Sequence, residues 1–209
     1  MHTHSFADYV HCIERDDWSG VGELMLASAN KLATIGCAFL ICPDNTIHRA
    51  LPDIEARSRL PWLHIAEVVA AEAVERGFGR LGLTGTRWLV ESEVYPGRLT
   101  PRRIEFVRPT VAERGEINRI IMDELVGGRM EPESIDYIQS VIGRMKDQGC
   151  DAVVLGCTEL PLIISAANSP LPPLDSTRLL ARAALRQAAQ PRIRIGPRTE
   201  RNGFDELES

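Results

Sequence analysis

Short, continuous apolar runs alternate with helical segments along most of this chain of 209 residues. A run of this kind, bounded by glycine or proline, is typical of a strand buried on both faces of a parallel sheet. Strands separated by helices imply right-handed βαβ units with helices on both faces. We therefore predict an α/β fold with strands in CAFLIC, PWLHI, RLGLTGT, RIEFVRP and CDAVVLG, at residues 37–42, 61–65, 80–86, 103–109 and 150–156.

Segments with apolar residues at helical spacing lie between these predicted strands. The first follows Asp17 and is expected to end at Gly36, because glycine commonly ends a helix. A helix within 87–99 is expected to end near Pro96, since proline lacks a backbone donor and clashes with the preceding turn. Further helices are predicted at 66–77, 111–126 and 132–148.

The composition limits the classes of partner. The net charge is −5 and the Lys and Arg residues are scattered, so we expect no nucleic-acid partner. No apolar run approaches the roughly 18 residues of a membrane span and no signal peptide is recognisable, so we expect no membrane partner and a cytoplasmic location. We expect no metal, because the five cysteines lack C-x-x-C spacing. We expect no cofactor, because the sequence contains neither a phosphate-binding loop nor a pyridoxal phosphate motif. The charged, aperiodic segment 190–209 is expected to be a disordered tail.

The chain aligns with itself once without a gap, with GCAFLICPDNT at 36–46 over GCDAVVLGCTE at 149–159. In this register Asp44 falls on Cys157, 113 residues later, at the end of an equivalent strand. Ligands of open α/β sheets bind outside the carboxyl ends of the strands. If two related half-domains face each other, Asp44 and Cys157 lie on opposite walls of one cleft. A substrate carbon between them could lose a proton to one wall and regain one from the other.

Each of these residues also has a purely structural interpretation. A cysteine after a buried strand is commonly a small buried apolar residue, and an aspartate before a helix commonly caps it. Glu159 could orient Cys157, contact a substrate amine or simply lie exposed at a helix start. His48 and His64 could support the site or be buried histidines with satisfied hydrogen bonds. The residues alone leave these alternatives open.

The segment VVLGCTELPLII at 153–164 closely resembles the second active-site motif of the aspartate/glutamate racemase family, whose members use two opposed bases without pyridoxal phosphate. The resemblance runs from about Ser5 to Ala188 and includes LPWLHIAE, GLTGTRWLVESEVYPGRL and RGEINRIIMDEL. It implies two similar parallel-sheet, Rossmann-like half-domains related by pseudo-twofold symmetry, and a homodimer. The N-terminal half-domain would comprise residues 1–77 joined by the C-terminal helix 176–189, and the C-terminal one residues 78–175.

The chain departs from the family pattern in two places. Its first strand-end motif has Asp44 where the family usually has cysteine, although the adjacent Asn45 and Thr46 match. Family members usually open with a strand, a loop of the type Gly-Gly-Met-Ser, a helix and a second strand. This sequence begins at about the end of that second strand, so we expect the N-terminal half-domain to be truncated by its first βα unit.

The resemblance also implies a substrate-binding set. Asn45, Thr46 and Thr158 should hold the substrate α-carboxylate, and the turn at Gly85 and Thr86 should contribute from the second half-domain. Glu159, His48 and His64 would stand behind these groups in supporting positions.

We therefore predict a cofactor-independent racemase of an aspartate- or glutamate-like amino acid, in which Asp44 and Cys157 abstract and return the Cα proton. A free aspartate is about 4.6 pKa units more acidic than a free cysteine, which weakens it as a base by on the order of 6 kcal/mol unless burial raises its pKa. The expected partner is a small amino acid or dicarboxylate. Two alternatives stay open: a one-cysteine decarboxylase or isomerase of the same superfamily, and a catalytically impaired, truncated member.

Overall fold

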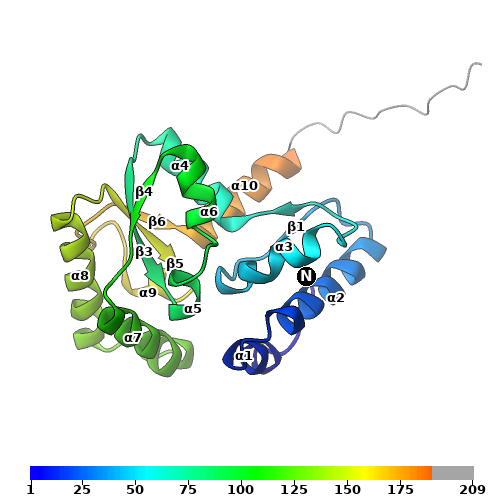
Figure 1. Ribbon diagram of the computed structural model, residues 1–209, viewed down its shortest axis with the longest axis horizontal. Helices are drawn as coiled ribbons and strands as arrows, with labels where there is room; N and C mark the ends of the chain where they lie inside the picture. The colour runs from blue at the N-terminus through cyan, green and yellow to red at the C-terminus, as the bar shows by residue number, and fades with distance from the viewer. Residues whose placement is uncertain (190–209) are drawn as a thin grey trace, which may run out of the picture.

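A computed structural model describes residues 1–189, and the predicted tail over 190–209 lies outside them. The described chain contains a four-stranded sheet with the order β4-β3-β5-β6 and a two-stranded sheet of β1 and β2 (Figure 1). Every strand pairing is parallel. The predicted α/β class with parallel sheets is confirmed, and the pseudo-twofold relation between half-domains stays a prediction.

The strands are β1 (Leu40–Ile41), β2 (Trp62–Leu63), β3 (Arg80–Gly85), β4 (Glu105–Val107), β5 (Ala152–Gly156) and β6 (Pro173–Asp175). The α-helices are α1 (Phe6–Glu14), α2 (Trp18–Thr34), α3 (Leu51–Glu55), α4 (Ile65–Glu75), α5 (Arg87–Val90), α6 (Pro96–Leu99), α7 (Val111–Arg119), α8 (Pro132–Asp147), α9 (Leu160–Ile163) and α10 (Ser176–Ala189). The other turns are the 3-10 segments η1 (Thr46–Ala50), η2 (Thr100–Arg102) and η4 (Leu125–Gly127) and the π-helical η3 (Ile120–Glu124).

The four-stranded sheet is covered by helices on both faces (Figure 1). Successive side chains of a strand point to opposite faces. Ala152 and Val154 of β5 accordingly pack with α4 and α10, whereas Val153 and Leu155 pack with α7 and α8. All five residues of β5 are buried, which explains why this strand was readable as a continuous apolar run.

The N-terminal segment has a core of its own, built from α1, α2, η1 and α3. Val21 and Met25 of α2 pack there against Ile47 and Leu51. Helix α4 instead packs with α10 over the four-stranded sheet. The division of the chain at residue 77 stays a prediction. No helix within residues 1–189 is both long and apolar enough to cross a membrane.

Two expectations about local structure are wrong in part. The predicted strand over 37–42 shrinks to Leu40 and Ile41, and it is not buried on both faces, since Ile41 is 42% exposed. The reason is that β1 pairs with only one strand of two residues. Pro96 begins helix α6 instead of ending a longer helix, a position where its missing N–H costs no hydrogen bond.

The predicted helix over 111–126 forms, but it changes its winding part of the way along. Helix α7 ends at Arg119, and the wider π turn η3 follows. Glu124 closes this turn from a buried position, where its carboxylate accepts hydrogen bonds from Arg119 Nη1 (2.7 Å) and Ser134 Oγ (2.6 Å). Single π turns inside helices are frequent at functional sites, and this one borders the pocket described below.

Candidate active site

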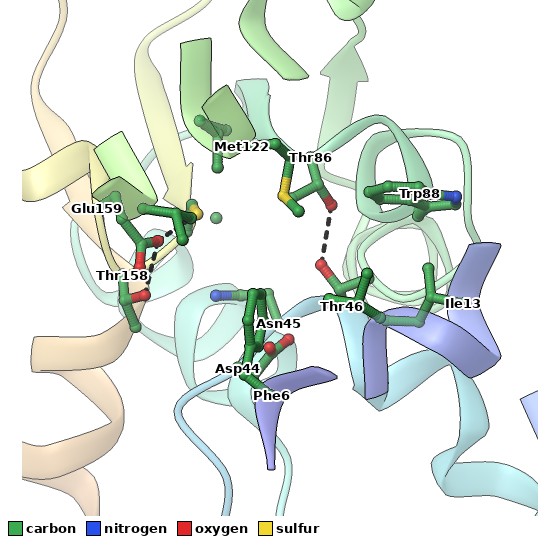
Figure 2. A pocket seen from close by; sticks show the side chains of 15 residues that line it. Phe6, Ile13, Asp44, Asn45, Thr46, Thr86, Trp88, Met122, Thr158 and Glu159 are labelled. Atoms are coloured by element: carbon green, nitrogen blue, oxygen red, sulfur yellow. Dashed lines mark hydrogen bonds between the residues drawn. The ribbon is translucent and has the colours of Figure 1, made fainter. Parts of the chain in front are cut away.

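A pocket lies where the ends of β3 and β5 meet the segment that follows β1. Gly85 and Gly156 are paired in register at the ends of the two strands. Figure 2 shows Asp44 and Asn45 on one side of the space, Thr158 and Glu159 on another, and Met122 and Thr86 on a third. The lining residues are Phe6, Val10, Ile13, Asp44, Asn45, Thr46, Thr86, Trp88, Ile121, Met122, Val126, Gly156, Cys157, Thr158 and Glu159.

The paired glycines bring the two strand ends close together. A Cβ on Gly156 would lie 2.6 Å from the Thr84 carbonyl oxygen, and one on Gly85 would lie 2.9 Å from the Gly156 oxygen. Gly85 also has φ of 149°, a backbone conformation that favours glycine. Gly85 itself does not line the pocket, so the expected contribution of this turn comes from Thr86 alone.

Cys157 is the first residue after β5, and its thiol donates a hydrogen bond of 2.7 Å to Glu159 Oε2. The same carboxylate oxygen accepts a bond of 2.7 Å from the Thr158 hydroxyl. Burial raises the pKa of the Cys157 thiol well above its usual value, and the negative charges of Glu159 and Asp44 raise it further. At neutral pH the residue is therefore a thiol that points at a carboxylate.

Asp44 comes three residues after β1 and lines the same pocket as Cys157. Its Oδ1 accepts the backbone N–H of Ile47 at 3.2 Å, so the carboxylate also stabilises the start of η1. Burial raises the pKa of the Asp44 carboxyl, and the charge of Glu159 adds to this effect, while the backbone N–H groups of Ile47 and Thr46 oppose it. The structural and the catalytic interpretations of Asp44 are therefore compatible.

The side chain of Asn45 is held by a chain of buried hydrogen bonds. Tyr95 donates its hydroxyl to Asn45 Oδ1 (2.7 Å), and Asn45 Nδ2 donates to Ser176 Oγ (2.9 Å). Ser176 in turn donates to the carbonyl oxygen of Leu155 in β5 (2.8 Å). The amide orientation is thus fixed, and within residues 1–189 the second N–H of Asn45 has no assigned partner.

Three threonine hydroxyls border the pocket. Thr46 Oγ1 and Thr86 Oγ1 lie 2.9 Å apart and share one hydrogen bond. Thr86 Oγ1 also accepts the Leu89 N–H at 3.3 Å and so caps α5. Since two hydroxyls carry two protons and their mutual bond uses one, a second proton remains to be donated. Thr158 is exposed, and its proton is directed to Glu159.

His48 and His64 do not line the pocket. His48 is 1% exposed, its Nδ1 donates to the Asp44 carbonyl oxygen (2.7 Å), and its Nε2 accepts the Ile65 N–H (3.3 Å), which defines a neutral ring. Burial lowers the pKa of His48 to about 4. Burial, together with the neighbouring His48 ring and the Arg98 guanidinium, lowers the pKa of His64 to about 3, and its Nδ1 caps α4 by accepting the Ala66 N–H. His48 thus holds the backbone of Asp44, and the His64 ring packs against the His48 ring at a centroid distance of 4.8 Å.

The sequence did not indicate the apolar walls of the pocket. One comes from helix α1 and the other from α5 and the turns η3 and η4. Helical spacing predicts the helices within 87–99 and over 111–126 but none over α1, and spacing alone does not separate a face that packs on a core from one that borders a cavity. The apolar lining residues are Phe6, Val10, Ile13, Trp88, Ile121, Met122 and Val126.

Comparison with known proteins identifies relatives across nearly the whole chain. The model of the family described as Asp/Glu/Hydantoin racemase matches residues 1–184. The broad specificity amino-acid racemase RacX of Bacillus subtilis (strain 168) is 22% identical over 172 residues, covering 81% of this chain and 73% of that protein. The crystal structure of a putative Asp/Glu racemase from Yersinia pestis superposes with a TM-score of 0.82 at 34% identity, covering 90% of this chain and 82% of that one. The crystal structure of an aspartate racemase homologue from Pyrococcus horikoshii OT3 superposes with a TM-score of 0.73 at 28% identity, covering 84% of this chain and 77% of that one.

Proposed function

The chain belongs to the Asp/Glu/hydantoin racemase family, and from this we propose that it interconverts the enantiomers of an α-amino acid by moving the Cα proton between Asp44 and Cys157. The observation that carries the proposal is that both side chains line one pocket from different elements, Asp44 after β1 and Cys157 after β5. Two acid–base groups on separate walls are what inversion at a carbon requires.

Neutral donors on one side of the pocket suit the substrate α-carboxylate. The unassigned N–H of Asn45 and the remaining hydroxyl proton of the Thr46–Thr86 pair can both point into the pocket. Because Asn45 is already held by Tyr95 and Ser176, its donor is positioned before the substrate arrives. Donors fixed in advance stabilise the negative charge that spreads from Cα onto the carboxylate in the transition state.

The proton balance is the same in both directions. In one direction the Asp44 carboxylate takes the Cα proton, and the Cys157 thiol gives its proton to the opposite face of the carbanion. The products are then protonated Asp44 and a Cys157 thiolate. In the other direction the thiolate abstracts and the Asp44 carboxylic acid donates. Proton transfer by a positioned group contributes roughly 10² to 10⁴ in rate.

Glu159 is placed to handle the proton of Cys157. Its carboxylate already accepts the thiol hydrogen, so it can take that proton when Cys157 must act as a thiolate. Burial raises the pKa of Asp44, which makes its carboxylate a stronger base than that of a free aspartate. The carboxylates of Asp44 and Glu159 would also attract the substrate ammonium group.

An assay of enantiomer interconversion tests the proposal. Single enantiomers of a panel of amino acids are incubated with the protein, and the products are separated by chiral chromatography. We expect interconversion of at least one amino acid, lost in Cys157→Ala. If no member of the panel is interconverted, or if Cys157→Ala retains the wild-type rate, the proposal fails.

One observation favours a second candidate. The Asp44 carboxylate already caps η1 through the Ile47 N–H, so it has a structural role that needs no proton transfer. Cys157 would then be the single proton donor to a carbanion formed by loss of carbon dioxide, as in a one-cysteine decarboxylase. Release of carbon dioxide from a substituted malonate, without exchange of any amino-acid Cα proton, would select this reaction over racemisation.

A further inference from the structure

Helix α1 forms an apolar wall of the pocket. Helix α1 contributes Phe6, Val10 and Ile13, three residues on one face of that helix. Figure 2 shows Phe6 beside Asp44 and Ile13 beside Thr46. These side chains offer no hydrogen-bonding atoms, so a polar substituent that reaches them would lose its water without replacement.

The opposite wall is apolar as well. Ile121 and Met122 come from the π turn η3, Val126 from η4, and Trp88 from α5. The π turn matters because the extra residue in its winding changes which side chains face the pocket. In Figure 2 Met122 lies above the space between Asn45 and Glu159.

No lysine, arginine or histidine lines the pocket within the part of the chain that the structure describes. Arg87, next to Trp88, holds its guanidinium over the Trp88 ring at 4.9 Å from the centroid. Arg98 lies 3.9 Å from Glu67 in a salt bridge. The charged groups that do line the pocket, Asp44 and Glu159, are acidic.

From this lining we infer that the substrate is an α-amino acid with an apolar side chain, rather than aspartate or glutamate. The inference rests on the proposed racemase function and names the substrate of the same site. A second carboxylate would be buried against apolar walls without a cation, and it would be repelled by the two acidic groups. An apolar side chain gains from the same walls by leaving water.

Deuterium exchange at Cα, followed by proton NMR in deuterium oxide, tests the inference on the full chain. The probes are both enantiomers of leucine, methionine and phenylalanine, compared with those of aspartate and glutamate. We expect the apolar set to exchange at least tenfold faster at equal subsaturating concentration. Exchange of aspartate or glutamate at an equal or higher rate would overturn the inference and leave the proposed function intact.

A binding measurement separates failure of the inference from failure of the function. If no amino acid exchanges, the proposed function fails, and the melting temperature with each probe then decides the pocket's preference, since a ligand that binds the native state stabilises it. A larger increase with leucine or phenylalanine than with aspartate supports an apolar pocket. An equal or larger increase with aspartate contradicts it.

Placing a cation in the pocket should reverse the preference. We expect Met122→Lys to raise the exchange rate of aspartate relative to that of leucine at least tenfold. If no amino acid exchanges, the increase in melting temperature with aspartate relative to that with leucine should rise instead. Val126→Lys, at a 43% exposed position of the same lining, provides a second variant that tolerates the charge more readily. Met130→Lys, at an exposed residue outside the lining, is the matched control and should leave the ratio unchanged. An unchanged ratio in both pocket variants would overturn the inference.

Discussion

The Cys157 thiol and the Glu159 carboxylate are joined by a hydrogen bond of 2.7 Å, in which the sulfur is the donor. This contact makes the protonation of the two residues interdependent. The carboxylate stabilises the thiol form through its charge and its hydrogen bond, and it is also the nearest group able to receive the thiol proton.

Replacing Glu159 by glutamine should therefore change reactivity and activity in opposite directions. Loss of the charge lowers the pKa of Cys157, so alkylation of Cys157 by iodoacetamide should reach its half-maximal rate at a lower pH. Interconversion should nevertheless slow by about a hundredfold, because the acceptor of the thiol proton is gone. Peptide mass spectrometry follows the alkylation, and Glu131→Gln, at an exposed site, is the control. An unchanged alkylation profile would contradict this assignment.

Asp44→Asn should stabilise the protein at neutral pH while it suppresses racemisation. The folded-state pKa of Asp44 is raised, so the favourable contribution of the carboxyl is complete below the unfolded pKa and is lost as the pH rises through the folded value. Asparagine avoids this loss. Thermal unfolding should show a higher midpoint for the variant at pH 7 and no such advantage below about pH 3.9, the ordinary aspartate value. A lower midpoint at pH 7 would mean that the cap on the Ile47 N–H outweighs the cost of burying the charge.

Tyr95→Phe should destabilise the fold by about 1 to 3 kcal/mol, because it leaves the buried Asn45 carbonyl oxygen without its donor. It should also raise KM, since Asn45 is then less firmly held. Chemical denaturation measures the first effect and steady-state kinetics the second. Tyr137→Phe is the control, because no hydrogen bond from the Tyr137 hydroxyl is formed within the described residues. The double variant Tyr95→Phe/Ser176→Ala should lose less free energy of unfolding than the two single variants lose together, as expected for residues of one hydrogen-bond network. Full additivity would contradict a shared role.

Acidification should weaken the fold through His48. Its folded pKa of about 4 lies below the ordinary value of 6.5, so the stability it contributes is present above pH 6.5 and is lost as the pH falls through about 4. For this pKa shift of His48 the loss in free energy of unfolding is about 3 kcal/mol. Asp44 has a raised pKa, so its protonation at acidic pH stabilises the fold and offsets part of this loss. Chemical denaturation measures the free energy of unfolding at pH 7 and at pH 4, and the difference between the two should be smaller for His48→Gln than for wild type. His11→Gln, at an exposed site, is the control and should retain the full difference. Equal differences in all three proteins would refute the assignment.

The sequence predicted the parts of the fold that depend on local pattern. The run at 150–156 is readable because β5 is covered on both faces, and the self-alignment predicted that Asp44 and Cys157 border one pocket, which they do. Their roles as bases stay a prediction. The run at 37–42 was misleading, because an apolar run does not reveal how many strands will flank it.

The rest of the site depends on contacts between distant segments. Asn45 is held by Tyr95 and Ser176, which are 50 and 131 residues away, and no local pattern connects them. One apolar wall comes from α1, which is not among the helices predicted from the sequence. The other includes η3, where helical spacing indicates only that one face is buried. Pro96 is likewise predicted from the sequence to end a helix, whereas in the structure it begins α6.

The most direct test of the two-base account follows deuterium into Cα from each enantiomer separately, using the amino acid that the protein interconverts fastest. The equilibrium constant between enantiomers is unity, so any variant changes kcat/KM for interconversion equally in both directions, and only exchange distinguishes the bases. We predict that Asp44→Asn abolishes exchange from one enantiomer and retains it from the other, and that Cys157→Ala gives the reverse. Equal loss of exchange from both enantiomers in Asp44→Asn would contradict the assignment of one base to each face.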